Sequence, residues 1–174
     1  MLPLCTNFKW MLICEPISNM NAETIGQFKK WCNKAERCRT DFKVRAQKLG
    51  LTSDVSEIIL VTLESEGWLD EQRYAKAFVH DKSAIAKWPE KRIRLTLKTK
   101  GIPPAFVQQA IEEEYVLDEA SEMKRWIVIK LKSYKQTDTR KRYAALFRFL
   151  MGKGFAGEKV SEALRDYREG FDSI

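Results

Sequence analysis

Residues 92–111, RIRLTLKTKGIPPAFVQQAI, hold the pattern that decides the fold of this chain. Ile93 and Leu97 are spaced as on one side of a helix, and Gly101 stands where that helix would end. A glycine adopts the left-handed conformation that closes a helix at little cost, and an apolar residue after it, here Ile102, can fold back onto the helix. Two prolines, which suit a first helical turn, then open a second apolar stretch. The segment therefore predicts two helices joined by a glycine stop.

The same pattern occurs three times. Gly50, Gly101 and Gly154 are spaced 51 and 53 residues apart, and each has apolar residues at helical spacing on both sides. A further amphipathic helix is expected in front of each pair. We place these helices near residues 22–37, 71–84 and 118–134.

These elements predict an all-α fold of three tandem three-helix repeats. A unit of this size buries little surface alone, so we expect neighbouring repeats to stack in an elongated, curved array. The predicted domains are an appended N-terminal tail followed by three repeats, with boundaries at residues 1–20, 21–69, 70–117 and 118–174.

Charge is distributed unevenly along the chain. The formal net charge is +7 over 174 residues, and three basic runs stand out, at residues 29–48, 87–100 and 124–153. Residues 54–71 form an acidic belt without Lys or Arg. A single basic run is typical of a solvated helix face, but three at similar intervals favour an acidic or polyanionic partner, such as nucleic acid, an acidic protein groove or a membrane face.

The residue inventory disfavours catalysis and metal binding. No metalloprotease, serine-hydrolase or glycine-rich phosphate motif occurs, so we predict no catalytic residue, no enzyme activity and no cofactor. The four cysteines form no close pair, and the single histidine, His80, lies far from them in sequence. This arrangement disfavours both zinc and a disulfide framework and indicates a reducing compartment. Residues 1–20 resemble neither a signal peptide nor a membrane span, so we expect a cytoplasmic protein without membrane association.

The stretch GWLDEQRYA, residues 67–75, has the residues of a joint between two helices. Gly67 ends the preceding helix and Asp70 is expected to cap the next one. Leu69 and Tyr74 have the spacing of a hydrophobic staple. Arg73 is not needed for the joint, so we expect it to pair with an acid of the belt or to contact a partner.

The basic helices supply most of the candidate contact residues. In KWPEKRIRLTLKTKGI, residues 87–102, Ile93 and Leu97 turn to the core while Lys and Arg gather on another side. Nearby aromatics such as Trp88, Tyr134 and Tyr143 could stack on bases, although packing is their ordinary role. The residues predicted to contact a partner are Arg73, Lys87, Arg92, Arg94, Lys98, Arg140, Arg142 and Arg148.

Three of these stretches, in this order and spacing, resemble the RecX family of bacterial regulatory proteins. GWLDEQRYAKAFVHDK is similar to the family segment GxLDDxRFAxxF, and KWPEKRIRLTLKTKGI is similar to the segment that ends in K-G-I. YAALFRFLMGKGFAGEKVSEAL is similar to the third-repeat segment with R-G-F at its centre. The similarity runs from about residue 25 to 168, and Pro89 stands where family members often carry Gly.

The resemblance implies a non-enzymatic protein that binds the RecA recombinase. Family members lie in the groove of the RecA–single-stranded-DNA filament, restrain its growth, strand exchange and ATP hydrolysis, and thereby limit DNA repair and the SOS response. We accordingly expect a monomer that binds the filament, with weak direct contact to single-stranded DNA and no membrane. The alternative is a DNA-binding protein or transcription regulator that uses one of the glycine-turned pairs as a helix-turn-helix.

Overall fold

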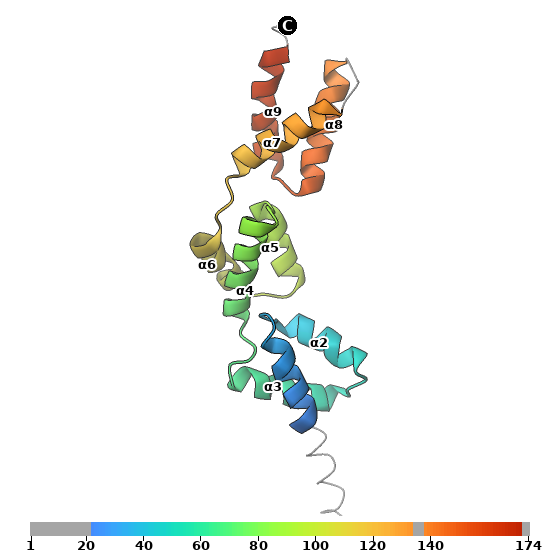
Figure 1. Ribbon diagram of the computed structural model, residues 1–174, viewed down its shortest axis with the longest axis vertical. Coiled ribbons are helices and arrows are strands. Elements are labelled where there is room, and N and C mark those ends of the chain that lie inside the picture. The colour runs from blue at the N-terminus through green and yellow to red at the C-terminus, as the bar shows by residue number, and fades with distance from the viewer. Residues whose placement is uncertain (1–21, 134–137, 172–174) are drawn as a thin grey trace, which may run out of the picture. The chain divides into compact units, whose positions relative to one another are not determined.

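The computed structural model describes residues 22–133 and 138–171, with side chains to residue 165. Every regular element in these ranges is helical, which confirms the predicted all-α fold of helical repeats (Figure 1). The chain divides into two compact units, residues 1–74 and 75–174. The predicted tail, residues 1–20, and Tyr134 lie outside the described residues, and the repeat boundaries stay predictions.

The first unit holds three helices around one core. A helix over residues 22–32 is followed by α2 (Arg39–Lys48) and α3 (Ser53–Ser65), which pack against each other. Their apolar faces meet in a cluster of buried side chains: Phe28, Cys32, Phe42, Ala46, Ile59, Leu60, Leu63 and Leu69. Arg39 of α2 also pairs with Glu64 of α3 across the outside of this core.

The first helix is shorter than the predicted span of residues 22–37. It ends at residue 32, and the chain turns before α2 begins. The physical reason is that Cys32 and Cys38 are both buried. Six residues apart on a continuous helix they would point about 120° away from each other. Leaving the helix after Cys32 lets the chain bury both thiols, and this depends on tertiary packing that periodicity does not report.

The second unit begins within α4 (Glu71–His80), which continues into a π-helical turn, η1 (Asp81–Ile85). The chain then forms α5 (Glu90–Thr99) and α6 (Pro104–Glu114), which pack together. Ser83 is completely buried in the π turn, where its hydroxyl donates to the carbonyl of His80 and accepts from the backbone N–H of Val116. This buried hydroxyl links the end of α4 to the chain that leaves α6.

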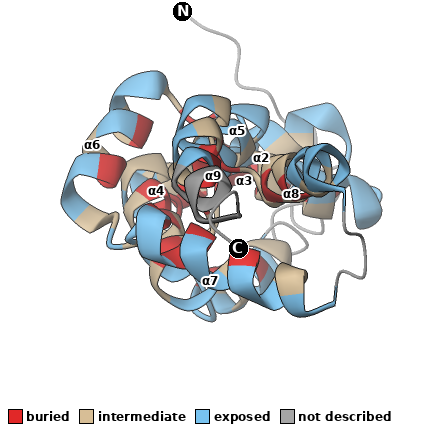
Figure 2. Ribbon diagram, turned by 90° about the horizontal axis from the view of Figure 1, so that it is seen from above, coloured by how far each residue is buried: buried red, intermediate tan, exposed pale blue. Residues whose placement is uncertain are grey.

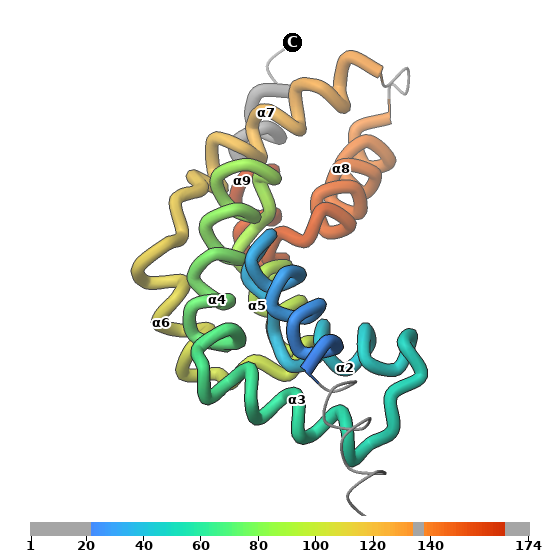
Figure 3. Tube along the Cα trace, turned by 60° about the horizontal axis from the view of Figure 1, so that its bottom comes forward, coloured from blue at the N-terminus to red at the C-terminus, as the bar shows by residue number. Residues whose placement is uncertain are grey.

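Three further helices complete the second unit, and Figure 3 follows the chain through them. They are α7 (Glu119–Lys132), α8 (Thr139–Lys153) and α9 (Gly157–Phe171), and each packs on the other two. The short run WIVIKL, whose apolar pattern also allows a strand, lies within α7. Their core consists of Met123, Ile127, Leu146, Leu150, Phe155, Val160 and Leu164. Figure 2 shows buried residues on one side of these helices and exposed residues on the other.

The three repeat glycines end their helices as the spacing predicts. Gly50, Gly101 and Gly154 have φ values of 69°, 78° and 100°. In each case the next residue donates its backbone N–H to a carbonyl in the last turn of the helix, as Ile102 does to Leu97 at 3.1 Å. Gly67, with φ 73°, closes α3 in the same way. None of the described helices has the length and apolar character needed to cross a bilayer.

Candidate partner-binding surfaces

The joint before α4 has the predicted local geometry. Asp70 accepts a hydrogen bond from the backbone N–H of Arg73 at 2.9 Å, and both Leu69 and Tyr74 are buried. Arg73 donates through Nε to Glu36 at 2.7 Å and through Nη2 to the carbonyl of Gly67 at 3.0 Å. Its carboxylate partner is therefore outside the acidic belt. Arg73 links the glycine stop to the turn before α2, and about half of its side chain stays exposed.

The predicted contact residues on and before α5 differ in their exposure and in whether another side chain already contacts them. Lys98 is exposed, and Lys87 is an exposed residue in the left-handed conformation, with φ 52°. Arg94 donates to Glu90 one turn earlier at 2.6 Å, so its charge is partly balanced within the helix. Arg92 places its guanidinium 3.8 Å from the centre of the Trp88 ring. Lys87, Arg92 and Lys98 thus remain the candidates most open to a partner.

Arg92 also joins the two halves of the second unit. A Cβ built on Gly154 would lie 2.8 Å from the Cβ of Arg92, so the Arg92 side chain packs directly against the backbone at the end of α8. The basic side of α5 therefore meets the C-terminal end of α8, where Lys153 lies. Arg73 belongs to the first unit, and the other seven predicted contact residues belong to the second.

Helix α8 begins with cations where a helix prefers acids. Its first turn carries Arg140, Lys141 and Arg142 and no acidic residue, and Asp138 caps it by accepting from the N–H groups of Arg140 and Lys141. Positive charge at a helix N-terminus opposes the helix dipole. The helix dipole therefore does not favour these residues, although Lys141 lies 3.9 Å from the capping carboxylate of Asp138. Further along, Arg148 is exposed and donates only to the carbonyl of Ala144 one turn earlier, at 3.3 Å.

An aromatic cluster on α7 and α8 was not predicted as a contact site from the sequence. Trp126 and Phe149 meet edge to face, with ring centres 5.9 Å apart, and both are half-buried. Lys153 lies 3.9 Å and Arg125 4.8 Å from the Trp126 ring centre, and Lys130 lies 5.3 Å from the Phe149 ring centre. The spacing of Trp126 and Lys130, one helical turn apart, was the signal in the sequence that could have revealed it. Phe149 and Lys153 have the same spacing on α8.

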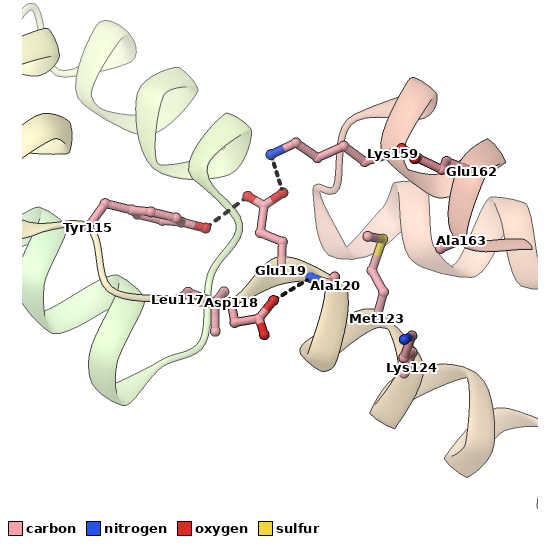
Figure 4. Close-up of a pocket in the computed structure, with 10 residues that line it drawn as sticks. All are labelled: Tyr115, Leu117, Asp118, Glu119, Ala120, Met123, Lys124, Lys159, Glu162 and Ala163. Carbon is pink, nitrogen blue, oxygen red and sulfur yellow. Dashed lines mark hydrogen bonds and ion pairs between the residues drawn. The ribbon is translucent and has the colours of Figure 1, made fainter.

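A buried carboxylate holds the two halves of the second unit together (Figure 4). Glu119 is 8% exposed. Its Oε1 accepts from the Tyr115 hydroxyl and from the backbone N–H of Glu90, both at 2.8 Å, and its Oε2 accepts from Nζ of Lys159 at 2.9 Å. The chain before α7, the start of α5 and α9 are thereby tied to one side chain. A cavity of about 470 Å³ opens beside it, with Met123, Glu162 and Ala163 in its wall.

The protonation of this junction follows from its contacts. Burial alone would raise the pKa of Glu119, but the Lys159 ammonium, the Glu90 N–H and the Tyr115 hydroxyl together hold that pKa below its ordinary value. The hydrogen bond to Glu119 raises the pKa of Lys159. Burial, and then the hydrogen bond to Glu119, raise the pKa of Tyr115. At neutral pH the junction therefore holds a carboxylate, an ammonium and a neutral phenol, which is a structural clasp rather than a proton-transfer site.

The described residues contain no group of three potential metal ligands drawn from His, Cys, Asp and Glu. Cys32 and Cys38 are buried thiols, and burial is the main cause that raises the pKa of the Cys32 thiol. His80 is exposed, with Asp81 as its nearest acid at 3.7 Å.

Fold and surface together define an all-α protein of helical repeats with basic, aromatic-bearing faces. Residues 70–111 match the family model described as RecX, second three-helix domain. The regulatory protein RecX of Vibrio vulnificus (strain CMCP6) is 31% identical over 119 residues, which cover 66% of this chain and 72% of that protein. The chain belongs to the RecX family of regulatory proteins.

Other relatives extend the comparison. The regulatory protein RecX of Geobacillus kaustophilus (strain HTA426) is 28% identical over 135 residues, covering 76% of this chain and 50% of the relative. The chain thus spans about half the length of this longer relative. A solved structure of regulatory protein RecX has a TM-score of 0.78 at 18% identity over 95% of this chain and 81% of that one. RecX from Lactobacillus salivarius gives 0.68 at 16% identity, covering 90% and 99%. These two structures show that the fold is shared.

Proposed function

We propose that this chain is a non-enzymatic regulator of the RecA recombinase, acting in the cytoplasm. It binds the groove of the RecA–single-stranded-DNA filament and mostly inhibits filament growth, strand exchange and ATP hydrolysis, and so restrains DNA repair and the SOS response. Membership of the RecX family supports the class of function. The observation that supports an anionic partner is the run of cations in the first turn of α8, where positive charge opposes the helix dipole.

The proposed mechanism is occupancy of the groove by a monomer. Cations of α5 and α8 pair with acidic groups and phosphates of the filament, and the bound chain blocks the space that an added protomer or a second DNA strand needs. Direct contact with single-stranded DNA is weak, and the Trp126–Phe149 pair offers it an aromatic face. Because the attraction is between charges, binding weakens with salt.

The test is RecA-catalysed strand exchange and ATP hydrolysis with the chain present below the RecA concentration. The native chain should slow both reactions, and the variant Arg140→Gln/Arg148→Gln should need a several-fold higher concentration to do so. The matched control is Lys34→Gln/Arg165→Gln, which removes the same net charge from exposed residues elsewhere and should act like the native chain. If the native chain leaves both reactions unchanged, the proposal is wrong.

A helix-turn-helix regulator would behave differently in the same preparation. It would protect a defined site on double-stranded DNA from cleavage, whereas a filament regulator prefers the RecA-coated single strand to bare duplex. Protection of a specific duplex site at low nanomolar protein, without any effect on RecA, would favour that second class.

A further inference from the structure

Two arginines in the first unit stack on one tryptophan. The guanidinium of Arg37, in the turn before α2, lies 4.7 Å from the ring centre of Trp31. The guanidinium of Arg45, on α2, lies 5.1 Å from the same ring and 5.8 Å from the ring of Phe28. A guanidinium over an aromatic ring is attracted to the face of that ring, and this contact restrains the arginine side chain.

The Nε groups of these arginines are buried, and no described residue accepts a hydrogen bond from either. Several other arginines of the described chain are paired with acids, for example Arg39 with Glu64, Arg73 with Glu36 and Arg125 with Glu122. A buried charged donor without an acceptor costs free energy, and such a group calls for an explanation. The Nε atoms themselves are closed to solvent, but both side chains are only half-buried, so an oxyanion that binds at this place would accept from the outer N–H groups of the two guanidiniums.

A pocket of about 280 Å³ opens beside these side chains. It is lined by Trp31, Arg37, Asp41, Val44, Arg45 and Lys48, which are three cations, one acid and two apolar walls. The volume lies just under the roughly 300–1,000 Å³ of ordinary ligand pockets, so it suits one small unit rather than a large ligand. The residues in its wall carry a net charge of +2, and a carboxylate, with a single negative charge, would neutralise only half of it.

We infer that this pocket binds a nucleoside phosphomonoester. A phosphomonoester carries close to two negative charges at neutral pH and several acceptor oxygens, which match the charge balance and the two guanidinium edges. Trp31 and Val44 supply apolar surface for the attached sugar or base. The source is either a free nucleotide or the 5′-phosphorylated end of a DNA strand. The inference goes beyond the proposed regulation of RecA and does not depend on it.

The experiment measures binding to the full chain by isothermal titration calorimetry, without RecA. The ligands are thymidine 5′-monophosphate, thymidine, and an oligothymidylate with either a 5′-phosphate or a 5′-hydroxyl end. The monophosphate should bind about tenfold or more tightly than thymidine, and Arg37→Gln/Arg45→Gln should remove that advantage. Lys43→Gln, an exposed cation of the same helix outside the pocket, is the control and should change affinity less than about twofold. Circular dichroism checks that each variant folds.

Lys48→Gln provides a second variant, at the exposed rim of the pocket, for the case in which the arginine variant does not fold. It should weaken binding of the monophosphate several-fold.

A preference for the 5′-phosphorylated strand over the monophosphate identifies a strand end as the ligand, and equal binding of the two strands identifies the free nucleotide. The inference is overturned if the monophosphate binds no better than thymidine, or if neither Arg37→Gln/Arg45→Gln nor Lys48→Gln weakens it. A phosphotyrosine peptide that binds more tightly than either nucleotide ligand would also overturn it. Because RecA is absent, a negative result leaves the proposed function untouched.

Discussion

Gly154 meets two separate requirements at one residue. Its φ of 100° disfavours any side chain, and the space where a Cβ would stand is taken by Arg92. Gly50 has only the first requirement, because a Cβ there would meet nothing within 4 Å. The repeat pattern treats the two glycines as equivalent, but the structure separates them by what lies beside them.

Replacing Gly154 should therefore destabilise the chain more than replacing Gly152, the glycine two residues earlier on α8. We expect Gly154→Ala to lower the free energy of unfolding by about 2 kcal/mol, from left-handed backbone strain and the clash with Arg92. Gly152→Ala is the matched control, since Gly152 is helical with open space around it, and should be neutral or stabilising by about 0.5–1 kcal/mol. Urea unfolding followed by circular dichroism measures both. Equal stability of the two variants would contradict this account.

Glu119 makes stability depend on pH in a defined direction. Its pKa in the folded chain is held below the ordinary value, so its contribution is present above the unfolded pKa and is lost as the pH falls through the folded pKa. Glu119→Gln should lower the free energy of unfolding by about 1–3 kcal/mol at pH 7. The difference from the native chain should shrink as the pH falls below about 4.

The control for this measurement is Glu162→Gln, the same change at an exposed residue in the wall of the same cavity. It should unfold like the native chain between pH 7 and pH 3. Thermal unfolding at several pH values gives the comparison. A Glu119→Gln deficit that stays constant down to pH 3 would show that the carboxylate is not the group that matters.

Among the elements, α4 has a first turn that neighbouring residues cap and that also contacts residues distant in sequence. Asp70 caps it, as its place before the first turn predicts. Arg73, in that first turn, reaches back to Glu36 and to the carbonyl of Gly67. The hydrogen bond to Asp70 therefore starts the helix from neighbouring residues. The ion pair of Arg73 with Glu36, which is distant in sequence, then links this helix start to the turn before α2.

Removing the cap should loosen the start of α4. Asp70→Ala should cost about 1 kcal/mol in the free energy of unfolding and speed amide hydrogen exchange in the first turn, whereas Asp70→Asn should cost a few tenths because the amide oxygen still caps. Hydrogen exchange followed by mass spectrometry reports both. Faster exchange that is confined to α7, whose own cap is Asp118, would contradict this assignment.

At the scale of the whole molecule, charge dominates what the chain can bind. The net charge is +7, and many of its cations are balanced by internal ion pairs, such as Lys76 with Glu113 and Lys29 with Glu66. Among the cations that remain exposed are Lys91, Arg92 and Lys98 on α5 and Arg140, Lys141 and Arg148 on α8. Counting charges along the sequence identifies the basic runs, but only the tertiary contacts show which charges are available.

Salt should separate these two kinds of cation. Binding to single-stranded DNA, measured by fluorescence anisotropy between 50 and 200 mM salt, should weaken steeply, and Arg140→Gln/Arg148→Gln should reduce the slope of log K against log salt by about 1 for each arginine that pairs with a phosphate. Arg94→Gln should leave the slope nearly unchanged, because Arg94 is already paired with Glu90. If Arg94→Gln lowered the slope as much as each of the other two replacements, the ion pair with Glu90 would not be keeping Arg94 from binding a phosphate.

Most of the fold follows from local signals, and most of the surface does not. Gly50, Gly101 and Asp70 act through their own backbone or the next few residues, so spacing predicts them. The end of the first helix at residue 32 and the partner of Arg73 depend on residues distant in sequence, and the sequence pattern missed both. The one-turn spacings of Trp126 with Lys130 and of Phe149 with Lys153 are visible in the sequence, but the meeting of the two rings is not, because it needs two helices side by side.

The sequence alone determined the helical class, the glycine stops, the repeat of about fifty residues and the resemblance to the RecX family, because each rests on interactions within a few turns of chain or on an ordered set of motifs. Tertiary structure decided which charges are paired between distant parts of the sequence, as Arg73 is with Glu36, and which side chains meet between helices, as Glu119 and Lys159 do. It also decided that Arg37 and Arg45 lie over Trp31 with buried, unsatisfied N–H groups in the described structure. Such contacts join residues that no periodicity relates, because packing in three dimensions brings them together.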